Sequence, residues 1–156
     1  MKLAEALIER KTIKEHLSRL RSRMTDNARV QEGDRPVEDP QVLLAEAEAT
    51  VQHLRELTVQ INLTNNQTVL STTDPRTLMA AIADRDMLTL RRGMLEELAR
   101  ASTNADRGFY VTRTEIKFVP VVDAAALQKQ VDALAKEYRE LDTLIQLRNF
   151  EADLLV

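Results

Sequence analysis

The stretch that decides the fold closes the chain: DAAALQKQVDALAKEYRELDTLIQLRNFEADLLV, residues 123–156. Its stripe residues recur at alternating intervals of three and four, and they are Leu127, Val131, Leu134, Tyr138, Leu141, Ile145, Arg148, Ala152 and Leu155. Only Arg148 is not apolar, so this heptad spacing predicts a long helix over 123–153 that packs along one narrow stripe. Asp123 is the expected N-cap.

Three further helices are predicted upstream, over residues 2–24, 40–66 and 75–101. Asp39-Pro40 and Asp74-Pro75 each place a capping carboxylate before a proline, which suits the first turn of a helix. The expected inward stripes are Leu3, Ala6, Arg10, Ile13, Leu17, Leu20 and Met24; Leu44, Ala47, Val51, Leu54, Thr58, Ile61 and Asn65; and Leu78, Ala81, Arg85, Leu88, Arg92, Leu95 and Ala99. At a rise of about 1.5 Å per residue, such helices would be about 35–45 Å long. Helices of that length favour a bundle.

Residues 108–121 carry a different pattern, with β-forming side chains in alternation around Phe109, Val111, Ile116 and Phe118. They predict a small β-hairpin, or a two- to three-stranded sheet in which residues 28–31 take part. The expected fold is therefore mainly α: a long antiparallel four-helix bundle or coiled coil, in a single domain over 1–156, with one small β element.

Composition excludes several classes of protein. The 156 residues include no cysteine, so disulfides, thiol catalysis and zinc–thiolate sites are ruled out. A net charge of −3 argues against nucleic acid as a partner. No run of about 18 apolar residues predicts a membrane span. The N-terminus lacks an apolar signal segment, which predicts a cytoplasmic protein.

No catalytic or metal signature is recognisable, so an enzyme is not favoured and neither a metal nor another cofactor is expected. The two histidines, His16 and His53, do not follow a glutamate by three residues, as the di-iron sites of helical bundles require. The three glycines are isolated and form no phosphate-binding loop.

Polar residues on the predicted inner stripes are the strongest candidates for a site. Arg10, Asn65, Arg85, Arg92 and Arg148 occupy such positions. A buried charge needs a partner, and Asp86 is one candidate. Three interpretations remain open: the arginines extend to solvent, they fix the register of the helices, or they bind a small anionic ligand. In INLTNN, residues 61–66, we expect Asn65 to point inward and Asn62 to lie on a neighbouring face.

Several stretches together resemble the septicolysin-like family of short bacterial helical proteins. They are MKLAEALIERK, NARVQEG, INLTNN, AIADRDML, EIKFVPVVD and YRELDTLIQLRNF. The resemblance implies a compact, oligomeric helical protein without an assigned reaction. It singles out Arg85-Asp86, Asn62 with Thr64-Asn65, and Gln146 with Asn149. The chain departs from the family at Leu147 and Phe150.

These observations rank three hypotheses. The first is a non-catalytic structural or interaction protein that forms a homo-oligomeric helical bundle, because Leu144, Leu147, Phe150 and Leu154 add a second apolar surface to the last helix. The second is a small-molecule or anion-binding module that uses the polar stripe residues. The third, which rests on the family label alone, is a pore-forming lysin.

Overall fold

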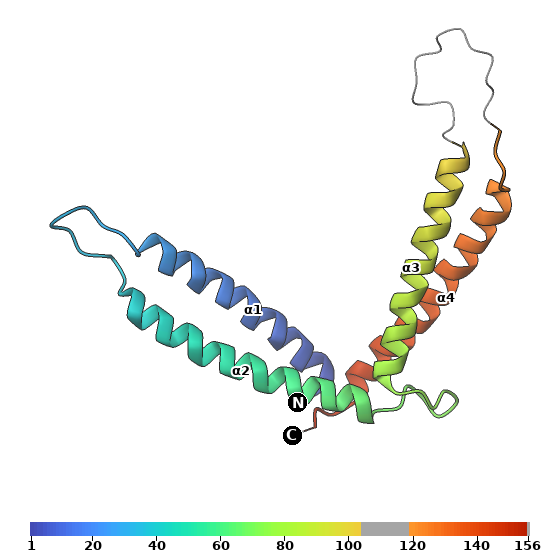
Figure 1. The fold of residues 1–156 in the computed structure, drawn as a ribbon. Helices are drawn as coiled ribbons and strands as arrows, with labels where there is room; N and C mark the ends of the chain where they lie inside the picture. Colours follow the sequence, from blue (N-terminus) through green and yellow to red (C-terminus); the bar gives the residue numbers. More distant parts are fainter. Residues whose placement is uncertain (104–118, 156) are drawn as a thin grey trace, which may run out of the picture. The chain divides into compact units, whose positions relative to one another are not determined.

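The computed structural model describes residues 1–103 and 119–155, and they are mainly helical (Figure 1). The four helices are α1 (Leu3–Asp26), α2 (Pro40–Gln67), α3 (Leu78–Thr103) and α4 (Ala124–Glu151). The prediction of a mainly helical chain with four helices is confirmed.

The chain divides into two compact units. Unit 1 consists of Met1–Leu78 and Gln146–Val156, and unit 2 of Met79–Ile145. In unit 1, α1 packs along α2 as an antiparallel pair (Figure 1). In unit 2, α3 and α4 lie side by side, bridged near one end by an ion pair between Arg85 and Asp142. Each unit is thus organised around one pair of antiparallel helices.

Two of the three predicted caps start their helices. The Asp39 side chain accepts a hydrogen bond from the Gln41 backbone at 2.8 Å, directly before Pro40. Asp123 Oδ1 accepts from the backbone nitrogens of Ala125 and Ala126, at 2.9 and 3.0 Å. Because these carboxylates satisfy amides that have no partner within the helix, they fix where α2 and α4 begin.

The third predicted cap does not start a helix, since α3 begins at Leu78 rather than at residue 75. The Asp74 carboxylate binds the Arg76 side chain instead, and this hydrogen bond lowers the pKa of Asp74. An isolated antiparallel bridge between Val69 and Thr77 then brackets the turn. Asp74-Pro75 therefore stabilises a tight loop ahead of the helix.

The buried residues follow the predicted stripes on α1 and α4, but on α2 the inward line is rotated. Leu44 and Val51, predicted to be inside, are exposed, whereas Leu43, Leu57 and Thr64 are buried. Two heptad lines share Ala47, Leu54 and Ile61 on this helix and differ in the intervening residues. Both are apolar enough to pass as the core, so spacing alone could not choose between them.

The predicted β element is not supported. None of residues 1–103 and 119–155 forms a strand, and only isolated bridges occur there. Residues 28–31 belong to an irregular loop that is closed by Asn27, whose side chain donates to Arg23 O and accepts from the Glu38 backbone, both at 3.0 Å. Gly33 turns this loop with φ of 94°. The predicted strands within 108–118 lie outside the described residues.

Candidate functional site

Arg85, predicted to lie on the inner stripe, is partly buried in unit 2 and bound on two sides. Its Nη1 donates to Asp142 Oδ1 on α4 at 3.0 Å, and its Nε and Nη2 donate to Asp86 Oδ1 at 3.1 and 2.9 Å. Burial acts to lower the pKa of Arg85, but its hydrogen bonds to Asp86 and Asp142, together with the charges of these carboxylates, outweigh burial and raise that pKa. Arg85 therefore bridges α3 and α4 as a permanent cation.

The other stripe arginines differ in how they are satisfied. Arg92 Nε lies 3.2 Å from Glu96 Oε1, close enough for an ion pair but without the alignment of a hydrogen bond. Arg10, in unit 1, is partly buried and has no ion pair or hydrogen bond within the described part of the chain. Arg85 and Arg92 belong to unit 2, and Arg10 and Arg148 to unit 1.

The INLTNN stretch does carry a polar group inward, but it is Thr64. Asn62 is exposed and Asn65 is partly buried, whereas Thr64 is fully buried. Its Oγ1 donates to Gln60 O at 2.7 Å and accepts from the Leu155 backbone at 3.0 Å. A threonine can satisfy its own hydroxyl on the preceding helical turn. That property, together with the alternative heptad line on α2, was the signal that sequence reasoning missed.

Arg148 and Asn149 lie in the last turn of α4, the part of this helix that belongs to unit 1. Arg148 Nε donates to Val69 O at 2.9 Å, and its Nη1 donates to Glu151 at 3.2 Å. Asn149 is only 5% exposed, and its Oδ1 has no hydrogen-bond partner among the described residues. Arg148 thus ties the loop after α2 to α4 and is occupied in doing so.

The two chain ends are joined in the same unit. Leu3 N donates to Ala152 O and Leu154 N donates to Met1 O, both at 2.9 Å. Lys2 Nζ lies 2.8 Å from Asp153 Oδ1, and its hydrogen bond lowers the pKa of that carboxyl. These contacts hold residues 1–3 against residues 152–154.

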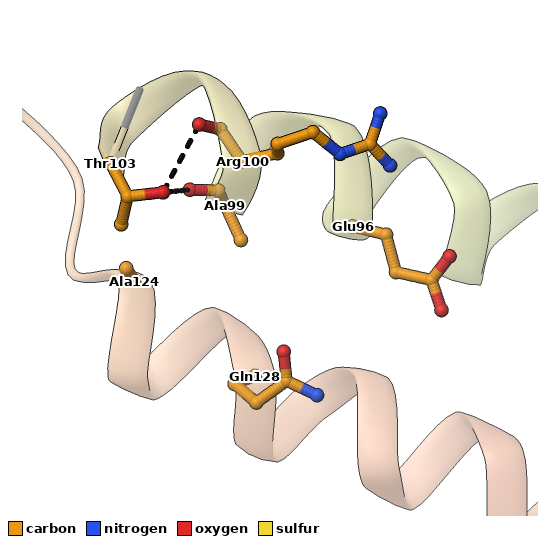
Figure 2. Close-up of a pocket in the computed structure, with 6 residues that line it drawn as sticks. All are labelled: Glu96, Ala99, Arg100, Thr103, Ala124 and Gln128. Atoms are coloured by element: carbon orange, nitrogen blue, oxygen red, sulfur yellow. Dashed lines mark hydrogen bonds between the residues drawn. The ribbon is translucent and has the colours of Figure 1, made fainter. Parts of the chain in front are cut away.

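A cavity of about 420 Å³ opens between the C-terminal end of α3 and the start of α4 (Figure 2). Glu96, Ala99, Arg100, Thr103, Ala124 and Gln128 line it. The Thr103 hydroxyl donates back to α3, to the carbonyl oxygens of Ala99 and Arg100 at 3.3 and 3.1 Å. The Arg100 guanidinium has no hydrogen-bond or ion-pair partner among the described residues.

A second feature of unit 2 is a row of exposed apolar side chains along α3. Met79, Met87, Leu90, Met94 and Leu98 form this outer α3 row. They lie on one side of the helix, because their spacing follows the helical repeat, and the buried Ala81 and Leu88 lie on the opposite side. The helix therefore has two apolar faces, and among residues 1–103 and 119–155 only one of them is buried.

On α4, Leu144, Leu147 and Phe150, predicted to form a second apolar surface, are exposed at intervals of three residues and form a shorter row. The exposed apolar residues of α1 and α2 do not form such a row. On α2 they are Val42, Leu44, Val51, Val59 and Leu63, and at 100° per residue they spread over about half of the helix circumference. On α1 the exposed large apolar residue is Ile8 alone. Scattered apolar residues of this kind are ordinary on protein surfaces.

Histidine and carboxylate groups make cross-helix pairs in unit 1. His16 Nε2 hydrogen-bonds Glu46 at 3.1 Å, and His53 Nε2 hydrogen-bonds Glu9 at 2.8 Å. Over 1–103 and 119–155, three metal-binding side chains nowhere come together in a group that could hold an ion. Among the helices as described, none has the length and apolar character needed to cross a bilayer.

Comparison with known proteins gives a family but no activity. The profile of a family of unknown function (DUF6847) matches residues 10–154. A crystal structure of a functionally unknown conserved protein from Corynebacterium diphtheriae is similar, with a TM-score of 0.89, 39% sequence identity and 99% of each chain covered. Curated proteins yield no match.

The septicolysin-like resemblance is therefore wrong, since the matching profile is that of a different family and the similar structure is of a protein of unknown function. The stretches that suggested it are mostly amphipathic helix turns, as in AIADRDML and YRELDTLIQLRNF. Heptad patterns of this kind recur in unrelated helical proteins, so they do not identify a family.

Proposed function

This chain belongs to a family of unknown function (DUF6847), and we propose that it is a structural or interaction protein that assembles with copies of itself. In this proposal the helices contribute to a homo-oligomeric helical bundle in the cytoplasm, and the chain carries out no reaction. The proposal rests on one observation, the outer α3 row.

The outer α3 row is too regular to be incidental. It extends from Met79 to Leu98, which is about 28 Å along the helix. Monomeric proteins rarely expose contiguous apolar patches larger than a few hundred Å². A continuous row with helical spacing is the pattern by which one helix recognises another.

The energetic balance favours association of moderate strength. Each row residue is about half exposed, so its burial contributes about 1 kcal/mol. Five residues from each of two chains give about 10 kcal/mol, against an association cost of about 4–15 kcal/mol. Charged side chains beside the row add little to this sum. At the lower end of that cost the net binding free energy is about −6 kcal/mol, so we expect an assembly with a Kd of about 40 μM.

Native mass spectrometry at about 100 μM, a concentration that populates complexes of this strength, tests the proposal. We expect wild-type protein at a whole multiple of the 17.7 kDa chain mass, and the Leu90→Lys/Met94→Lys variant at the mass of one chain. Ile8→Lys is the matched control, because Ile8 is 65% exposed on α1 and outside the row. Wild-type protein that stays monomeric would refute self-assembly.

A second candidate function, binding of a small anion, is favoured by the cavity beside Arg100. A guanidinium can bind a carboxylate or phosphate through two parallel hydrogen bonds, in a bidentate geometry. Of the four arginines that the sequence suggested for this role, Arg85, Arg92 and Arg148 contact carboxylate or carbonyl oxygens of the chain itself. The fourth, Arg10, does not line the cavity. Arg100 therefore replaces them as the candidate anion-binding residue.

Thermal-shift titration with succinate and with phosphate tests anion binding. We expect stabilisation of wild-type protein that is lost in Arg100→Met and retained in Arg139→Met, an exposed arginine of α4 away from the cavity. Equal responses from both variants, or none from wild-type protein, would exclude the cavity as an anion site.

A further inference from the structure

Three residues of the outer α3 row belong to a heptad repeat of α3 that is separate from the stripe through Arg85. Ala80, Ala83, Met87, Leu90 and Met94 follow one another at intervals of three, four, three and four residues. Met87, Leu90 and Met94 are each more than half exposed. This spacing is that of a and d positions in a two-stranded coiled coil, which requires a second helix.

We propose that the partner is the same row of a second copy of this chain, running parallel and in register with the first. This inference rests on the proposed self-assembly and specifies its interface. In such a pair Met87, Leu90 and Met94 each meet their own counterpart, so that side chains of equal size form successive layers along the seam.

Charges beside the row fit a parallel arrangement. In a parallel coiled coil, a residue just before an a position lies near the residue five places further along in the other helix. Asp86 and Arg91 have this spacing and flank the row on opposite sides. Both are exposed; Arg91 has no partner among the described residues, and the contacts that Arg85 makes use only Oδ1 of Asp86. Two equivalent Asp86–Arg91 pairs would therefore form across the dimer.

Gly93 supplies an independent observation. It lies in the interior of α3, where glycine lowers helix stability, and a Cβ added there would meet nothing within 4 Å. Packing within the chain thus gives no reason for a glycine. In the parallel pair Gly93 lies opposite Leu98 of the second copy, five places further along. The missing side chain leaves room for that leucine.

Disulfide scanning of the full chain tests this interface directly, because the protein has no cysteine of its own. Met87→Cys, Leu90→Cys and Met94→Cys are made singly, with Ile8→Cys as the control on α1. All four positions are exposed, so the variants should fold. Each is oxidised mildly and followed by non-reducing electrophoresis, and its mass without oxidation is measured by native mass spectrometry.

If the pair is parallel and in register, all three row variants should form covalent dimers at least about tenfold faster than Ile8→Cys. The reason is that a pre-formed complex raises the effective concentration of one cysteine near the other. Cross-linking of only one row position would indicate an antiparallel pair and overturn the proposed register. If the protein assembles but the row variants cross-link no faster than the control, the proposed interface is wrong and self-assembly occurs through another surface. Protein that is monomeric without oxidation would refute both.

Discussion

Helices α1 and α3 have nearly equal lengths, 24 and 26 residues, but they distribute apolar and charged side chains in opposite ways. α1 buries aliphatic residues such as Leu3, Ile13 and Leu20 and exposes one large apolar residue, Ile8. α3 holds the partly buried Arg85 toward α4 and exposes the outer α3 row. The comparison teaches that α1 leaves one large apolar side chain exposed, whereas α3 leaves a row of five exposed.

The largest effect should come from the α1 core. Leu20→Ala removes a fully buried side chain, and we expect it to lower the free energy of unfolding by about 2–5 kcal/mol. Leu90→Ala, at a position 58% exposed, should change that free energy by less than about 0.5 kcal/mol in dilute protein. Urea denaturation at low protein concentration measures both. Comparable losses in the two variants would break the contrast between α1 and α3.

The charged interior of α3 should give the next largest effect. Arg85→Met leaves Asp142 and Asp86 without their shared cation, and we expect a loss of about 1.5–3 kcal/mol in unfolding free energy. Arg10→Met is the counterpart on α1, where no described partner is lost, and should be close to neutral. Chemical denaturation compares the two variants. A larger loss in Arg10→Met would mean that Arg10 is the more important interior cation.

Gly93→Ala separates helix stability from association. Alanine should raise the unfolding free energy of dilute protein by up to about 1 kcal/mol, because it is the better helix former. The same change should weaken self-association, since the added methyl group takes up room assigned to Leu98 of the second copy. Urea melts and analytical ultracentrifugation of one preparation measure the two effects. Association that strengthens in this variant would contradict the role given to Gly93.

The smallest effect concerns the joined chain ends. The Lys2 hydrogen bond lowers the pKa of Asp153 in the folded protein, so the ionised carboxylate stabilises the fold above its ordinary pKa of about 4. That contribution is lost as the pH falls through the lowered value. Lys2→Met should therefore be slightly less stable near neutral pH and should converge with wild-type protein in acid. Melting curves from about pH 6 to about pH 2 measure this, and a constant difference would assign the effect elsewhere.

Much of the fold could be predicted because the heptad pattern is strong where helices are long. The buried apolar residues Val131, Leu134, Leu141, Ile145 and Ala152 all lie on the predicted stripe, and Asp39 and Asp123 cap the expected helices. The prediction that Asp74 caps a helix is wrong, because its carboxylate can accept a hydrogen bond either from an amide of the next helix or from the Arg76 side chain. Sequence does not show which of the two lies within reach.

The candidate site was less predictable for a related reason. Heptad spacing says which residues share a face, but it does not say which of two apolar faces is covered. On α2 this ambiguity concealed Thr64, and on α3 it concealed the outer row, because the stripe through Arg85 and Arg92 was the one assigned to the interior. The partners of the arginines depend on side-chain reach in three dimensions, which residue spacing leaves open.

Sedimentation equilibrium of the wild-type chain, over a protein concentration range centred on about 40 μM, tests self-assembly most directly. The account predicts a concentration-dependent mass that rises from 17.7 kDa toward twice that value, and no such rise in Leu90→Lys/Met94→Lys. A wild-type mass that stays at one chain throughout would contradict it, and the outer α3 row would then need another partner.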